Sequence, residues 1–232
     1  MARSRALLKV VAPTPSSTQR IVASIVEAIV ERRLMPGTKL AESQIGELFN
    51  VSRTVVRQAL NQLSRDRLVT LEPARGAFVA QPGIDEARQV FEARQLIEAG
   101  IVRELCGRIT TPQVATLRAH LKQEREAVAR TDVSGRTRLL ADFHVVLAQM
   151  LGNEVLAQLL ADLLSRSSLI ALMYQSSHSA EHSQAEHVAI VDALEKRDTR
   201  AAVKLMAQHL HTVEHNLRLD PRPTDLAKAL RP

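Results

Sequence analysis

Apolar residues recur at helical spacing early in the chain and predict a first helix. They are Ile21, Val22, Ile25, Ala28 and Ile29. The pattern stops at Met35-Pro36-Gly37, a turn signal. A second short helix is expected from Glu42 to Phe49, and Asn50-Val51 leave room only for a tight turn before another helix opens at Ser52. Two helices joined by so short a turn form a helix-turn-helix.

The helix that opens at Ser52 has two unlike sides. At about 100° per residue, one sector is polar and holds Arg53, Thr54, Arg57 and Asn61. The opposite sector is apolar and holds Val55, Val56, Ala59, Leu60 and Leu63. An arginine fork can pair with a guanine edge or with phosphate, and hydroxyl groups reach either target. The pattern is typical of a DNA-reading helix, and the plain alternative is an exposed charged helix face.

A β-hairpin should follow this helix. Residues 68–71 and 77–80 read as strands, and Glu72 to Gly76 read as the turn between them. Gly76 supplies the positive φ that tight turns often need, which leaves Arg75 at the tip. A cation there could enter a narrow minor groove, although an ordinary hairpin turn would look the same.

Beyond Pro82-Gly83 the pattern is almost wholly helical. Helices are predicted at Asp85–Arg108, Pro112–Arg130, Gly135–Leu151, Glu154–Gln175, Ser183–Lys196 and Thr199–Leu217. Thr111-Pro112 supplies a cap and a first-turn proline, and Asp198 caps the last helix. The fold class is therefore mainly α, a winged helix-turn-helix at 18–81 followed by an all-α antiparallel bundle at 84–219. Residues 1–17 form a basic arm and 220–232 a tail.

Charge separates the same two parts. The first 80 residues hold 12 Lys and Arg against six Asp and Glu, and the remainder is neutral. A basic module joined to a neutral one suggests a nucleic-acid binder attached to a sensing or assembling domain, or merely a soluble surface. With no Trp, one Tyr and four Phe, base stacking on aromatic platforms is disfavoured, which points to duplex DNA.

Cysteine usage and hydropathy indicate the compartment. The single Cys106 cannot form an internal disulfide, as expected in a reducing cytoplasm. No segment is expected to span a membrane, and residues 1–11 are too charged for a secretory signal.

The first domain resembles the winged helix of the GntR family of bacterial repressors. The matching motifs are Pro36-Gly37, Leu40 to Glu42, Ser52 to Leu60 and Arg75 to Val79. The resemblance implies DNA contacts from Glu42, Ser52, Arg53, Thr54, Arg57, Arg75 and Gly76. Val55 stands where the family usually has proline, which costs some pre-organisation of the helix and leaves the contacts unchanged.

The second domain carries five recognisable motifs: Phe143-His144, Glu186-His187, Met206 to Leu210, Arg94 to Glu98 and Gly152-Asn153. By these motifs it is similar to the FCD effector domain of the FadR branch. The family implies a divalent metal ion, zinc or nickel, held by His144, His187 and His209 in the bundle core. The acidic ligand usual one turn before the first histidine is replaced by Leu140, and Asp142 should point away. Hydrogen-bonded core histidines are the alternative.

The family also implies a small organic-acid effector, with Arg94 and Asn153 as binding residues. Arg94 could instead form an ion pair with Glu98 one turn away. The remaining histidines are expected at the surface: His120, His178, His182, His211 and His215. His211 and His215 form an i,i+4 pair that could ligate an ion.

Together these features predict a homodimeric, cytoplasmic transcription regulator, a repressor that binds a palindromic operator in double-stranded DNA. Two other classes of protein remain open. One is a metalloenzyme with a basic localisation domain, and the other is an adaptor that binds DNA without sequence preference.

Overall fold

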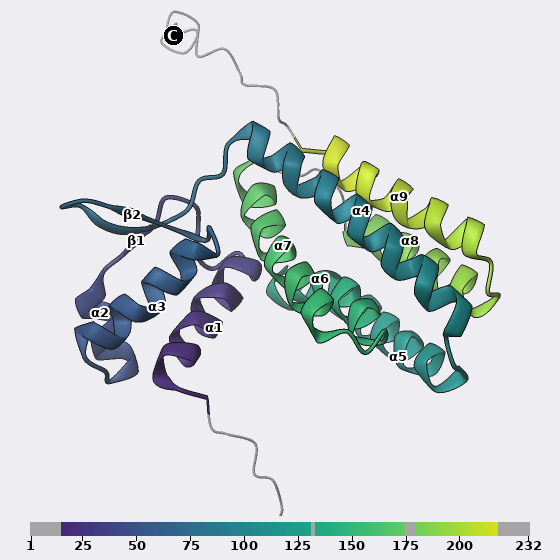
Figure 1. Cartoon of the computed structure of the whole chain (residues 1–232), viewed down its shortest axis with the longest axis horizontal. Coiled ribbons are helices and arrows are strands. Elements are labelled where there is room, and N and C mark those ends of the chain that lie inside the picture. Colours follow the sequence, from purple (N-terminus) through teal and green to yellow (C-terminus); the bar gives the residue numbers. More distant parts are fainter. Residues whose placement is uncertain (1–14, 131–132, 175–179, 218–232) are drawn as a thin grey trace, which may run out of the picture.

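The computed structural model describes residues 15–130, 133–174 and 180–217. The predicted arm up to residue 14, the tail from 220 and His178 lie outside these residues. A small N-terminal domain with one sheet adjoins a larger domain built from helices (Figure 1). The predicted fold class is thus confirmed.

The N-terminal domain is a helix-turn-helix followed by a wing. Helices α1 (Ser17–Val30), α2 (Glu42–Phe49) and α3 (Arg53–Arg65) are joined as the sequence predicts. Ser16 and Gln19 form a capping box that starts α1. Asn50 adopts a left-handed conformation with φ 51°, and the Val51 amide donates to the Gly46 carbonyl over 2.9 Å. This turn sets α3 across α2.

The wing contains one strand more than predicted. Strands β2 (Val69–Glu72) and β3 (Gly76–Val79) form the expected hairpin, and β1 (Lys39–Leu40) pairs with the other edge of β3. All pairings are antiparallel, with Lys39 opposite Phe78. The two-residue strand is too short for an alternating pattern to reveal it. Only tertiary pairing with β3 makes it a strand.

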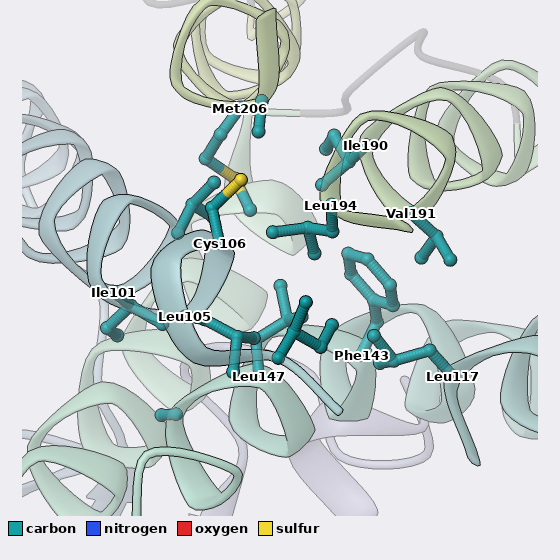
Figure 2. Packing of buried hydrophobic residues seen from close by; sticks show 14 of the residues in the cluster. Ile101, Leu105, Cys106, Leu117, Phe143, Leu147, Ile190, Val191, Leu194 and Met206 are labelled. Carbon is teal, nitrogen blue, oxygen red and sulfur yellow. The ribbon is translucent and has the colours of Figure 1, made fainter. Parts of the chain in front are cut away.

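The larger domain consists of α4 (Ile84–Arg108), α5 (Thr111–Ala129), α6 (Val133–Gln149), α7 (Glu154–Met173), α8 (Ala180–Glu195) and α9 (Thr199–His215). Helix α4 lies along α9, and α5 lies beside both α6 and α8 (Figure 1). Phe143, Leu105, Leu117 and Leu194 meet in the core, where all four are fully buried (Figure 2). Cys106 is buried in this cluster.

Of two predicted helix caps, one differs from the structure. The N-cap of α5 is Thr110 rather than Thr111, and its side chain accepts from the Gln113 amide in a capping box. Gln113 supplies the reciprocal bond, so the cap that satisfies more backbone donors is used. The cap of α9 is Asp198, as predicted, accepting from the Ala201 amide.

The expectation that no segment is long and apolar enough to span a membrane is wrong for helix α7. It is long and apolar enough to cross a membrane by length and composition, with mean hydropathy 1.5 over the most apolar stretch. The helix packs against α1, α4 and α6, where Leu160, Leu164 and Leu169 are buried. Its apolar side chains thus contribute to the bundle core and, through Leu169, to the core of the N-terminal domain.

The two domains are in contact through α1. This helix packs against α6 and α7. Arg138 of α6 forms an ion pair with Glu27 of α1. It also lies 3.8 Å from a carboxylate oxygen of Glu31, the C-cap of α1. The helix that supports α3 therefore also rests on the helical domain.

Candidate functional site

The predicted polar face of α3 is open to solvent. Arg53, Thr54, Arg57 and Asn61 are all exposed. On the opposite side Val56, Ala59, Leu60 and Leu63 are at most 2% exposed and pack against α1 and the wing. The two-sided helix inferred from the sequence is confirmed. Its exposed face has the shape and chemistry that a major groove accepts.

Glu42 and Arg57 are brought together at this face. The Arg57 Nε lies 2.9 Å from each carboxylate oxygen of Glu42, linking α2 to α3. This hydrogen bond and the Glu42 charge raise the pKa of Arg57. The pair is exposed, so it adds little stability. It orients the guanidinium over the face, which makes Glu42 a positioning residue in the free protein.

Ser52 occupies the N-cap position of α3, but its side chain makes no capping hydrogen bond. Its hydroxyl is exposed beside the first backbone N–H groups of the helix. Free N–H groups at a helix N-terminus favour phosphate. The position therefore suits a contact to the DNA backbone.

The wing presents a second group of cations. Gly76 has φ 104° and Ala74 has φ 61°, so two left-handed residues shape the turn. Arg75 is exposed, forms an ion pair with Glu72, and lies with its Cζ 5.3 Å from the Phe78 ring centroid. Lys39 Nζ lies 5.9 Å from the same ring. The sequence did not reveal Lys39, because only the pairing of β1 with β3 places it on the wing.

The three predicted histidines converge inside the helical domain. His144 of α6, His187 of α8 and His209 of α9 are at most 4% exposed. Each offers one ligand atom, and these atoms lie within 4.8 Å of one another. Phe143 stacks on His187 with ring centroids 3.9 Å apart. The convergence predicted from three separate helices is therefore present.

Each histidine also touches a carboxylate through Nδ1. The distances are 2.5 Å from His144 to Glu98, 3.0 Å from His187 to Glu124, and 2.7 Å from His209 to Glu186. A carboxylate can only accept, so each Nδ1 carries the proton and each Nε2 keeps its lone pair. The sequence showed neither Glu124 nor Glu186 in this role, because each carboxylate and its histidine come from different helices.

Burial and charge set the protonation of the cluster. Burial lowers the pKa of His144 and of His187, and it lowers that of His209 to about 4. Burial alone would raise the pKa of Glu98, but the Arg94 charge and the contact with His144 lower it. The three imidazoles are therefore neutral, and the Glu98 carboxylate beside them is ionised. Neutral imidazole is the form that binds a metal ion.

The cluster fits a divalent ion. Among the residues that the structure describes, His187 Nε2 is buried without a hydrogen-bond partner, and such an atom is satisfied by a ligand or an ion. The carboxylates on Nδ1 are the outer partners that ligating histidines usually have. His144, His187 and His209 line a cavity, called the histidine cavity below. Leu140 lines it at the position where an acidic ligand is usual, whereas Asp142 faces the other side of α6 and lines the cleft towards α1.

Arg94 forms the ion pair with Glu98 that the sequence analysis gave as an alternative. Its Nε donates to Glu98 Oε1 over 2.7 Å, and Arg94 and Glu98 are 4% and 1% exposed. Arg94 also lines the histidine cavity, which has a volume of about 130 Å³. The ion pair and a place in the effector cavity are thus compatible.

Other candidate residues lie elsewhere. Asn153 is the N-cap of α7, where its side chain accepts from the Leu156 amide, and it does not line the cavity. The expectation that His120 is a surface residue is wrong, since it lies 3.3 Å from Glu124 and is partly buried. His182, His211 and His215 are exposed as predicted.

Comparison with known proteins agrees with both domains. Residues 17–79 match the gntR family of bacterial regulatory proteins, and residues 89–212 match the FCD domain. The chain is 30% identical over 207 residues to the HTH-type transcriptional repressor RspR of Escherichia coli (strain K12). This match covers 89% of this chain and 91% of that protein. The Galactonate operon transcriptional repressor of the same strain is 28% identical over 82% of this chain and 91% of its own.

A solved structure described as a transcriptional regulator GntR from Rhodococcus sp. RHA1 gives a TM-score of 0.77 at 27% identity, over 87% of this chain and 97% of that one. These relatives and families are transcriptional regulators rather than enzymes, which removes the metalloenzyme alternative. The chain therefore belongs to the GntR family of bacterial regulatory proteins, with an FCD domain behind its winged helix, and is a transcriptional regulator.

Proposed function

We propose that the protein is a sequence-specific repressor, acting in the cytoplasm on a palindromic operator. The observation that carries this proposal is the exposed polar face of α3 over a fully buried apolar side. Arg53, Thr54 and Arg57 would reach base edges, Ser52 and Gly76 would contact the backbone, and Arg75 would enter the minor groove from the wing. Glu42 would hold Arg57 in place.

The operator proposal is tested with Arg57→Ala. Loss of a bidentate base contact lowers specific affinity by about 1–3 kcal/mol and relaxes the preference for one base. Arg200→Ala is the matched control, because it removes the same charge from an exposed position on α9. Fluorescence anisotropy with operator and scrambled duplexes measures both effects. Equal affinity of the unsubstituted protein for the two duplexes would favour the non-specific adaptor instead.

We propose that the protein acts as a homodimer, because one α3 helix reads only a few base pairs and two half-sites are needed for useful specificity. Large apolar side chains exposed on α4 and α7 of the helical domain are consistent with an interface there: Leu96 is 77%, Val155 73% and Leu159 51% exposed. Sedimentation equilibrium at micromolar concentration should give twice the mass of one chain. A monomeric protein that still binds a single palindrome tightly would contradict this.

We propose that the histidine cavity is the effector site. His144, His187 and His209 would hold a divalent ion, zinc or nickel. When bound, that ion supplies a Lewis-acidic position for a carboxylate oxygen. Arg94 would orient the acid. A small organic acid that binds one relative position of the domains more tightly would shift the equilibrium between DNA-binding and non-binding forms.

Elemental analysis of protein purified without an affinity tag tests the ion. About one equivalent of zinc or nickel per chain is expected, and His187→Ala should lose it. His211→Ala is the control, since that residue is exposed on α9 outside the cavity. A folded, metal-free protein whose His187→Ala variant responds normally to effector would show that the histidines are ordinary core residues.

A further inference from the structure

The histidine cavity is lined by both domains. Most of its wall comes from α4, α6, α7, α8 and α9, but Val30 and Arg32 also line it. These two residues belong to the DNA-binding domain, at the end of α1 and just after it. Arg32 is exposed, as a residue at the mouth of a cavity must be. A ligand in the cavity can therefore touch the DNA-binding domain directly.

The backbone holds Arg32 at that mouth. Arg32 has φ 59°, and the Leu34 amide beyond it donates to the Ala28 carbonyl over 2.9 Å, closing the last turn of α1. A left-handed residue after a helix is usually glycine, because a side chain is strained there. Arg67 and Arg197, which follow α3 and α8, adopt the same conformation, so it serves here to end α1 and to fix the position of Arg32.

A second cation acts on Arg32. Partial burial of its side chain, first, and the charge of Arg136, on α6, both lower the pKa of Arg32. Within the described part of the chain, no ion pair involves Arg32 or Arg136, although neighbouring Arg33 pairs with Glu31 over 2.7 Å. Arg136 directly precedes Thr137, which lines the same cavity as Arg32. Two like charges, one from each domain, thus lie near one cavity, and an anion between them would relieve their repulsion.

The inner wall explains why a second cationic subsite is needed. Glu98, Glu124 and Glu186 contact the histidines, and Arg94 is already paired with Glu98. The divalent ion and Arg94 together would balance these three carboxylates, so the inner wall has no positive charge left for a second anionic group of a ligand.

We propose that Arg32 and Arg136 form an anion-binding subsite at the mouth of the histidine cavity, and that the effector is a small acid with two anionic groups. One group lies at the inner wall near Arg94 and the histidines, and the other bridges the two domains. The inference rests on the proposed effector site. A cavity of about 150 Å³ holds a six-carbon ring, so the 130 Å³ here suits the body of a short diacid whose second carboxylate reaches the mouth.

The test compares succinate with butyrate, which has the same number of carbons and one carboxylate. Isothermal titration of full-length, tag-free protein should show tighter binding of succinate. Arg32→Gly should weaken succinate binding by about tenfold, the effect of losing one partly exposed charged contact, and leave butyrate nearly unchanged. Because glycine accepts the left-handed backbone, this variant should be at least as stable as the parent protein, which separates binding from folding. Arg136→Gln should weaken succinate binding similarly.

The matched control is Arg33→Gln, which removes a neighbouring arginine already paired with Glu31; it should bind succinate within about twofold of the parent. Inorganic phosphate is a second probe, and it should raise the unfolding temperature of the parent at constant ionic strength more than that of Arg32→Gly. The inference is overturned if succinate has no advantage over butyrate, if neither acid binds, or if Arg32→Gly binds succinate as the parent does. Operator binding is measured separately without acid, so failure of DNA recognition leaves these outcomes readable.

Discussion

Replacing Glu98 by glutamine gives the most direct test of the charge arrangement in the histidine cavity. Glu98 is 1% exposed, and its two oxygens lie 2.7 Å from Arg94 Nε and 2.5 Å from His144 Nδ1. Both partners donate hydrogen bonds. Glutamine keeps the shape but has one accepting oxygen, so its NH₂ group must face one of the two donors, and Arg94 loses its counter-charge.

The expected cost follows from burial. Removing one partner of a buried ion pair destabilises a protein by about 3–5 kcal/mol, because the other charge stays out of water. That is a large part of the roughly 5–15 kcal/mol by which proteins are usually stable. At about 2–4 °C per kcal/mol for a chain of this size, the unfolding temperature of Glu98→Gln should fall by roughly 6–20 °C.

The assay is urea or thermal unfolding followed by far-UV circular dichroism, because the chain has no Trp and one Tyr. A chelator in all samples ensures that loss of an ion does not account for the difference. Glu92→Gln is the control, since Glu92 is exposed on the same helix; it should change the free energy of unfolding by less than about 0.5 kcal/mol.

Two outcomes bear on the reasoning. If Glu98→Gln lies within about 1 kcal/mol of the parent, Glu98 is not an ionised partner of Arg94, and the charge arrangement is refuted. The double variant Arg94→Met/Glu98→Leu should recover much of the loss, because no unpaired charge then remains buried.

Three further predictions concern pH, the turn and the ion. In metal-free protein, the lowered pKa of about 4 for His209 means that the unfolded chain takes up the proton first. Stability is then full above about pH 6.5 and falls towards pH 4, by about 3 kcal/mol from this residue; a flat urea stability between these pH values would contradict it. Gly46→Ala should destabilise, since the new Cβ would lie 3.1 Å from a backbone oxygen, whereas Gly107→Ala meets open space on α4 and should be neutral or stabilising by up to about 1 kcal/mol; equal unfolding curves would refute the difference. Leu140→Asp should tighten zinc binding at least about tenfold by adding a ligand one turn from His144, measured by chelator competition; unchanged affinity would show that Leu140 is not at the ion.

Periodicity was sufficient for the helices because each of them is longer than two turns and buries one side. The bounds of α2 match the prediction, and α3 begins where its cap was expected. The cap of α5 was misplaced by one residue, since two adjacent threonines satisfy the same pattern. Strand β1 was missed because two residues carry no period. The apolar length of α7 was not recognised as comparable to a membrane span.

The amino-acid sequence by itself determined the two-domain order and the polar face of α3, since local periodicity encodes them, and its resemblance to the FCD domain singled out the three cavity histidines. Only the tertiary structure paired Glu42 with Arg57, gave each histidine its carboxylate and brought Arg32 of one domain to the cavity of the other. Such contacts join residues far apart along the chain. Their existence depends on how the helices pack, and no local pattern records that packing.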